Sequence, residues 1–375
     1  MTPRWLLLAV FSAILLAIVV TLIVGVPHRA TPDESNDAIA IMASYGANCF
    51  RLRLFVNPKP RDEWGGFTGN NLSYTLLLAR RVKAAGARLI LDIHYSDTWA
   101  DPGRQETPKE WENLSYPELL ARVYNYTRTT LEQFIQAGAY PDIVQIGNEV
   151  SCGFLWPYGK ICGIDDPESQ WNRFALLLKT AAQAVRDSAP NAKIAIHIPA
   201  TGWETTLWFF SNLEQRGVPF DVIALSYYPW WHGTLEKLRE NVEKASRTFG
   251  KEVLIVETAY PYKPVNLSAL PWSDASTAVW SLTPEGQRQY LIDIASTLNG
   301  TGCIGIIWWE PTLIPTPGLS PWLGGATALF DEEGKALPAL RSMAEVRRIL
   351  GEGSIIGGDI SSLAELERLG KTFKP

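Results

Sequence analysis

The sequence predicts an α/β fold: a closed (β/α)8 TIM barrel that is circularly permuted. Short apolar runs alternate with amphipathic helical segments along the chain. These runs are almost continuous in Ile, Leu and Val, which is typical of parallel strands buried on both faces of a sheet. The chain has 375 residues, and barrels of this kind commonly form one domain at that length.

A short helix at 36–47 is expected first, followed by strands that alternate with helices. This alternation favours either an open doubly wound sheet or a closed barrel. The expected strands, in chain order, are 48–55, 88–94, 142–149, 193–198, 221–228, 252–258 and 303–309. The expected helices between them are 72–86, 115–138, 168–189, 203–217, 233–250 and 284–299.

This strand count is one short of a barrel, and the chain ends on the remaining candidate, "SIIGGDI" at 354–360. The N-terminus cannot supply the missing strand, because it leads straight into the helix at 36–47. If 354–360 inserts between the first and last of the other strands, the sheet closes and loses its open edges. The alternative is that this tail frays or belongs to a following domain.

The N-terminus predicts export and a membrane tether. Residues 5–26 form an uncharged run that matches the roughly 20 residues needed to span a bilayer better than the shorter core of a cleaved signal. We therefore expect a cytoplasmic stub at 1–4, an anchor or signal at 5–26, a linker at 27–36 and the catalytic barrel at 37–375. The barrel would be extracytoplasmic, either anchored or, if the segment is cleaved, secreted.

Composition narrows the function further. A net charge of −5 argues against nucleic-acid binding, which needs a concentrated basic face. The chain contains 15 Trp, and such flat apolar rings can stack against sugars.

Cys152 and Cys162 could close a loop by a disulfide outside the cell, while Cys49 and Cys303 are expected to be buried thiols.

Polar residues follow the apolar strands where the active sites of barrels lie, at the carboxyl ends. Glu149 and Glu257 each end a very apolar strand, and a buried carboxylate needs a partner or a chemical task. Facing each other across a sugar, they would form the acid and nucleophile of a glycoside hydrolase. Either glutamate alone could equally be an ion-pair partner or a helix cap, and His94 and His197 could be structural. The functional interpretation rests on the convergence of these residues at one end of the barrel.

Five segments make the interpretation more specific: "LDIHYSDTWADPGRQETPKEW", "VQIGNEVSCGFLWPYG", "ALSYYPWW", "VETAYPY" and "WWEP". In sequence and order they resemble glycoside hydrolase family 53, the endo-β-1,4-galactanases. The resemblance implies a (β/α)8 barrel that cleaves β-1,4-galactan with retention of configuration. "GGDISSLAELERLG" is similar to the segment with which family members begin, here at the opposite end of the chain.

The resemblance also implies residue roles. Glu149 would be the acid/base and Glu257 the nucleophile. Among the expected substrate-binding residues, the resemblance implies Arg51, His94, Trp99, Asn148 and Trp309. Positions at strand ends, in the loops and in the tail add Asp92, Trp156, His197, Tyr227, Trp231 and Asp359. One departure from the family is "HIPATG" at 197–202, which lacks polar residues that members often carry there.

We therefore expect a retaining endo-galactanase that acts on galactan or galacto-oligosaccharides. No cofactor, metal or nucleic acid is expected to take part, and the protein is expected to be monomeric. The loop at 259–283 has Asp274 as its only acid, so the calcium site of some bacterial members is not expected. The alternatives are the same machinery acting on a mannan or glucan, or a membrane-tethered barrel that binds carbohydrate without cleaving it.

Overall fold

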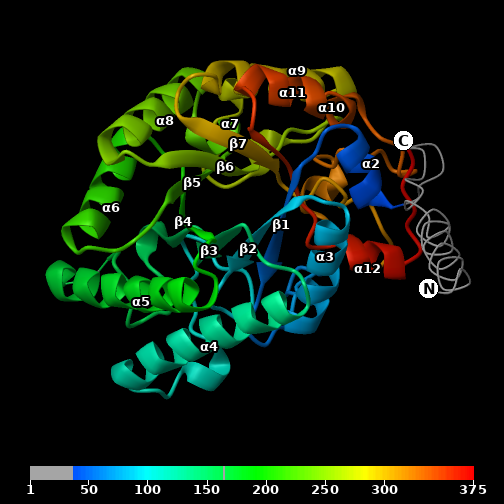
Figure 1. Ribbon diagram of the computed structural model, residues 1–375. Coiled ribbons are helices and arrows are strands. Elements are labelled where there is room, and N and C mark those ends of the chain that lie inside the picture. Colours follow the sequence, from blue (N-terminus) through cyan, green and yellow to red (C-terminus); the bar gives the residue numbers. More distant parts are fainter. Residues whose placement is uncertain (1–36, 164) are drawn as a thin grey trace, which may run out of the picture.

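The computed structural model describes residues 37–163 and 165–375 (Figure 1). Within this part of the chain, parallel strands form a closed barrel in the order β1 to β8, surrounded by helices. The predicted (β/α)8 architecture is therefore confirmed. The strands are β1 (Cys49–Leu54), β2 (Arg88–Ile93), β3 (Ile143–Ile146), β4 (Lys193–Pro199), β5 (Val222–Tyr227), β6 (Glu252–Thr258), β7 (Cys303–Trp308) and β8 (Ile355–Asp359).

The C-terminal strand closes the barrel as predicted. β8 pairs in parallel with β1, where Arg51 lies opposite Asp359, and with β7, where Gly305 lies opposite Ile355. Gly357 makes this closure possible, because a Cβ there would lie 1.6 Å from the carbonyl oxygen of Cys49. The alternative of a frayed tail is wrong. That this strand order is a circular permutation stays a prediction.

Each long helix expected between the strands is present. Several begin at a side-chain cap, as at Asn71 and Thr234, whose oxygens accept backbone N–H groups of the first turn. The helices are α2 (Ala38–Ser44), α3 (Leu72–Ala84), α4 (Tyr116–Gln136), α5 (Pro167–Ser188), α6 (Trp203–Gln215), α7 (Pro229–His232), α8 (Leu235–Phe249), α9 (Pro284–Leu298), α10 (Pro338–Arg341), α11 (Met343–Leu350) and α12 (Leu363–Arg368). Short 3-10 turns occupy Lys109–Trp111, Val150–Cys152, Leu267–Ala269, Ala275–Thr277 and Trp322–Gly325.

Strand alternation separates two cores. One set of residues packs between the strands and the helices, as Ile223 and Leu225 of β5 do. The other set fills the lower barrel interior with small and branched side chains: Cys49, Ile90, Ile143, Ala195, Val222, Ala224, Leu254, Val256, Ile307 and Ile355. Further along the same strands, the inward positions become polar, and this change marks the catalytic end.

The two ends of the barrel sequence lie on one flank of the molecule (Figure 1). Arg81 of α3 contacts Asp37, which precedes α2, and Glu367 of α12. Phe373 packs against Phe330 near the end of the chain. Residues 354–375 are thus integrated into the fold.

The predicted disulfide between Cys152 and Cys162 is present. Cys49 is buried as expected, whereas Cys303 is partly exposed because it lies at the open lower end of β7. The predicted segments 1–4, 5–26 and 27–36 lie outside the described residues. Among the helices that the structure does describe, none combines the length and apolar character needed to cross a membrane.

Candidate active site

Arg51 of β1 lies at the centre of the polar layer and is fully buried. Its guanidinium contacts the carboxylates of Asp92 at 2.8 Å, Glu257 at 2.9 Å and Asp359 at 3.0 Å. It also donates to Asn148 Oδ1 at 2.8 Å. Arg51 thereby connects β1, β2, β6 and β8 with the loop after β3, and it depends on the C-terminal strand for one of its partners.

Glu257 near the end of β6 faces the cleft beside a cation and a phenol donor. The register between β5 and β6 shifts after Leu225, so that Ser226 lies opposite Glu257 and Val256 is skipped. This β-bulge turns Glu257 toward the cleft, although strict alternation would have turned it outward. Besides Arg51, the hydroxyl of Tyr228 donates to Glu257 Oε2 at 3.3 Å.

Glu149 lies just beyond β3, where the backbone leaves the strand sharply. Gly147 has φ of 77° and Glu149 has φ of 45°, in the left-handed region that a bulky residue rarely adopts. Gln105 stabilises this turn by donating to the carbonyl of Asn148 at 2.7 Å. The Glu149 carboxyl is half-buried and accepts a hydrogen bond from the Ser226 hydroxyl. Ser226 therefore lies next to both Glu149 and Glu257.

Burial raises the pKa of the Glu149 carboxyl, and the hydrogen bond from Ser226 opposes this shift. Burial also raises the pKa of Glu257, while the charge of Arg51 opposes this and the charge of Glu149 adds to it. Mutual repulsion favours a state in which the pair shares one proton. Burial and the Glu257 charge raise the pKa of Tyr228, so its phenol stays a donor.

A hydrogen-bonded group at β3 and β4 orients the Glu149 turn. His197 Nδ1 lies 2.9 Å from Asn148 Oδ1 and 3.3 Å from the backbone nitrogen of Glu149. Gln145 bridges Asp92 at 2.7 Å and His197 at 3.1 Å. Burial, helped by the nearby Arg51 charge, lowers the pKa of His197, so this imidazole is neutral.

Aromatic rings line the β1, β2 and β7 side of the cleft. The Arg53 guanidinium lies 4.5 Å from the Trp99 ring centroid and 5.4 Å from that of Trp309. Trp99 donates its indole N–H to Asp62 at 2.7 Å, and His94 packs edge-on against Phe55. The Trp99 and Trp309 rings are both partly exposed. This side can therefore offer flat apolar faces to a sugar.

Comparison with known proteins agrees with this geometry. The family model "Glycosyl hydrolase family 53" matches residues 18–343. The chain belongs to glycosyl hydrolase family 53. It is 34% identical over 84% of its length, and 93% of the relative's, to a protein of Humicola insolens named arabinogalactan endo-β-1,4-galactanase.

Solved structures extend the likeness to the fold. A family 53 catalytic domain of Ignisphaera aggregans is 38% identical, covers 84% of this chain and 89% of its own, and has a TM-score of 0.73. A fungal β-1,4-galactanase structure is 35% identical, covers 81% of this chain and 90% of its own, and has a TM-score of 0.69.

The family 53 barrel brings most of the predicted site residues together, but with different exposures. Glu149, Trp99 and Trp309 are partly open to the cleft. Asp92 and Asp359 are fully buried, and their oxygens are engaged by Arg51 and other protein groups. These two aspartates therefore position Arg51. The structure does not place them at a sugar-facing surface.

The prediction that Tyr227 binds substrate is wrong, because this side chain points away from the cleft. It shares the outward parity of Ile223 and Leu225, packs in the outer core and donates its hydroxyl to the Gly233 carbonyl at 2.7 Å. The next residue, Tyr228, shares the inward parity of Val222, Ala224 and Ser226 and reaches Glu257. The sequence could have indicated Tyr228 in place of Tyr227, because every second residue from Val222 onward points into the barrel.

Trp156 and Trp231 both follow strand ends, Trp156 in the loop after β3 and Trp231 in α7 after β5. Trp156 is in the disulfide-closed loop, where its indole donates to the Cys152 carbonyl at 3.1 Å and Lys160 lies over its ring. Trp231 is 38% exposed and packs at 5.4 Å against Tyr228. Both residues can present a ring surface to solvent, and Trp231 does so beside the tyrosine that donates to Glu257.

Glu310 of the "WWEP" segment was missed as a site residue. It is buried, has φ of 49° and contacts Arg53 and the Ser362 hydroxyl. Burial raises the pKa of this carboxyl, and the charge of Arg53 opposes the shift. Arg53 also contacts Asp359 at 3.4 Å, so the network continues from Arg51 into the C-terminal tail.

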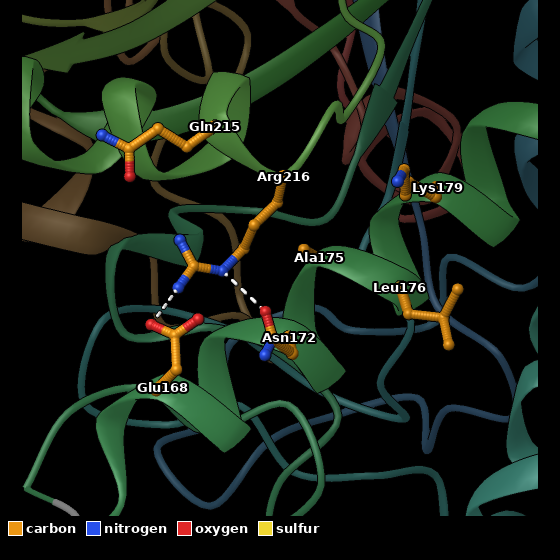
Figure 2. Close-up of a pocket in the computed structure, with 7 residues that line it drawn as sticks. All are labelled: Glu168, Asn172, Ala175, Leu176, Lys179, Gln215 and Arg216. Carbon is orange, nitrogen blue, oxygen red and sulfur yellow. Dashed lines mark hydrogen bonds and ion pairs between the residues drawn. The ribbon is translucent and has the colours of Figure 1, made fainter.

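A separate hollow of about 600 Å³ lies between α5 and α6, on the outside of the barrel (Figure 2). Three of its polar side chains pair with each other, since Arg216 contacts Glu168 at 2.6 Å and Asn172 at 3.0 Å. It is thus unlike the cleft, where acids and aromatic rings converge. Within 37–163 and 165–375, no cluster of three or more His, Cys, Asp or Glu residues could hold a metal ion.

Proposed function

We propose that this family 53 chain is a retaining endo-β-1,4-galactanase. The observation that carries the proposal is the arrangement of Glu149 and Glu257 around Ser226, with Arg51 and Tyr228 directed at Glu257 alone of the two. A guanidinium and a phenol donor both favour the charged form of a carboxyl. We therefore assign the shared proton to Glu149.

In the first step, Glu257 attacks the anomeric carbon, and the C–O bond to the leaving sugar breaks. Glu149 gives its proton to the departing oxygen, so this sugar leaves as an alcohol. The Glu257 oxygen forms an ester bond to the remaining galactosyl unit. Arg51 and the Tyr228 hydroxyl stabilise the carboxylate before attack and again when it leaves.

In the second step, the now ionised Glu149 takes a proton from water. This water attacks the anomeric carbon from the face opposite the ester bond to Glu257. The ester bond breaks, Glu257 returns as a carboxylate, and Glu149 regains its proton. Two inversions give net retention. Neutral His197 fixes the Glu149 turn through both steps, because its Nδ1 lies beside the Glu149 backbone nitrogen and Asn148 Oδ1.

The substrate class is β-1,4-galactan, the polymer that the name of the Humicola insolens relative indicates. Mannan and glucan are the alternative polymers for the same carboxylate pair. A third possibility is a barrel that binds galactan without cleaving it. The presence of both carboxylates, each held by specific donors, favours an active enzyme.

The test is digestion of purified galactan, mannan and glucan with wild-type protein, Glu257→Ala and the control Glu352→Ala, which changes an exposed loop residue. We expect galactan to be cleaved into oligosaccharides with β-configured new ends by NMR. Glu257→Ala should lower kcat by at least about a thousand-fold. Near-normal turnover by this variant, or α-configured first products, would contradict the mechanism.

We also propose that the barrel is a circular permutation of the family arrangement. The family match ends at residue 343, before β8. The segment at 357–370 that completes the ring is similar to the one with which family members begin. A permutation accounts for both observations, because it moves one strand to the other end of the chain while leaving its neighbours in space unchanged.

We propose further that residues 5–26 tether a monomeric barrel to the outer face of the membrane. The support is the length and lack of charge of this segment. After cell fractionation, we expect the full chain in the membrane pellet, released by detergent but not by high salt. A chain of 37–375 should be soluble and elute as a monomer. Release of the full chain by salt would contradict the tether.

A further inference from the structure

Aromatic rings continue from the nucleophile to the surface of the molecule. Tyr228, Trp230, Trp231 and Trp322 form what we call the aromatic wall. The Tyr228 ring lies 5.4 Å from both Trp231 and Trp322, and Trp231 and Trp322 are 5.9 Å apart with an angle of 30° between their planes. Because Tyr228 donates to Glu257, the wall begins at the reacting centre.

The loop between β6 and α9 is fastened onto the outside of this wall. The Trp231 indole donates to the Pro271 carbonyl at 3.1 Å, and the Asp274 backbone N–H donates to the Trp230 carbonyl at 2.7 Å. The Thr277 hydroxyl donates to the Pro229 carbonyl. These contacts anchor the loop on both sides of Trp272.

Trp272 itself contributes little to the stability of the fold. Its side chain is 98% exposed, and its backbone has φ of 53°, a conformation that is strained for a bulky residue. An indole that buries no surface and holds an unfavourable backbone is poorly explained by folding. Binding to something outside the chain explains it better.

We propose that Trp272 and the exposed face of Trp231 form an outer subsite for the galactan chain, a deepening that rests on the proposed function. One face of a galactose ring carries mainly C–H groups and can stack on an indole, while its hydroxyls stay in water. The subsite is continuous with the cleft through Trp231 and Tyr228. A galactan chain leaving the cleft along this wall would reach Trp272 next.

The polar groups beside Trp272 fit a sugar better than an anionic membrane surface. Asp274 and Ser276 are exposed, and the Ser276 hydroxyl donates to Asp274 at 2.6 Å. A carboxylate and a hydroxyl can bind sugar hydroxyls, whereas the negative charge of Asp274 repels lipid phosphates. A galactan chain is therefore the occupant that the surface favours.

The test compares Trp272→Gly with Trp208→Ala in the full chain. Glycine adopts positive φ without strain, so Trp272→Gly should not lower Tm. Trp208 is a matched control, because it is 45% exposed but lies on α6, where it packs against Trp171. The quantity measured is the ratio of kcat/KM on polymeric galactan to kcat/KM on galactotriose.

We expect this ratio to fall about ten-fold in Trp272→Gly and to stay at the wild-type value in Trp208→Ala. An unchanged ratio in Trp272→Gly, with wild-type protein active on galactan, would overturn this inference alone. An equal fall in Trp208→Ala would also overturn it, because the effect would then not be specific to the wall. Wild-type protein that releases no sugar from galactan would overturn the proposed function, and this inference with it.

Discussion

Arg51 shows how one buried side chain organises the chemistry of the cleft. Its contacts with Asp92 and Asp359 fix the guanidinium from two strands, so that one of its nitrogens lies 2.9 Å from Glu257. Glu149 has no comparable cation: a hydroxyl is its side-chain partner among the described contacts. This asymmetry separates the roles of two chemically identical residues, because a nearby cation favours the ionised form.

The raised pKa of Glu149 predicts a pH dependence of stability. Burial raises the pKa of this carboxyl above its usual value, and Glu257, whose pKa burial also raises, titrates with it as a pair. The unfolded chain loses the proton near pH 4.5, whereas the folded pair keeps it to a higher pH. The resulting stabilisation is complete below pH 4.5 and is lost as the pH rises through the raised pKa of the folded state, above which the pair carries a poorly solvated charge.

Replacing this group with a neutral isostere in Glu149→Gln should therefore remove the loss. We expect Glu149→Gln to match wild-type Tm at pH 4 and to exceed it by a few degrees at pH 8, an effect on the order of 1 kcal/mol because the side chain is half-buried. Glu352→Gln, at an exposed position, is the control. Thermal melts across this range measure the effect. Equal melting curves of Glu149→Gln and wild type at pH 8 would argue against a raised pKa.

At the level of strands, most of the fold could be predicted from the sequence. The apolar runs of β1 to β7 and the partnerless "SIIGGDI" sufficed to predict a closed ring, because a buried parallel strand needs neighbours on both edges. What could not be predicted is local geometry. The bulge at Val256 depends on how β5 and β6 pair, and no alternation pattern within β6 reveals it.

The site shows the same limit. The end of an apolar strand and the family motif both point to Glu257, but alternation counted from Leu254 turns it away from the cleft. Tyr227 is among the predicted binding residues and Tyr228 is not, although the inward parity of β5 favours Tyr228. Glu310 follows the strand end in a left-handed conformation, so its direction depends on the turn. One-residue errors of this kind move a side chain to the opposite face.

At the level of the whole molecule, the C-terminal tail is both a structural and a functional part. It supplies β8, which removes the open edges of β1 and β7, and it supplies Asp359, which holds Arg51 and Arg53. Loss of the tail would therefore expose two strand edges and free the cation beside the nucleophile. The order in which the chain connects the strands should matter less for folding. Asp37 and Glu367, near the two ends of the barrel sequence, both contact Arg81, so these ends already lie close together.

A rearranged chain should thus fold and act like the original. In this variant, residues 352–375 precede 37–351, and a Gly/Ser linker of about eight residues, reaching roughly 15 Å, joins Pro375 to Asp37. The new ends lie in the exposed turn before β8. We expect Tm within a few degrees of the 37–375 chain and galactan cleavage within about three-fold, because every strand keeps its neighbours.

The control is 37–351 alone, which should aggregate, since β1 and β7 then have open edges. Circular dichroism, thermal melts and galactan digestion decide the matter. A rearranged chain that fails to fold, or a tail-less chain that remains active, would mean that β8 does not close the barrel in solution as it does here.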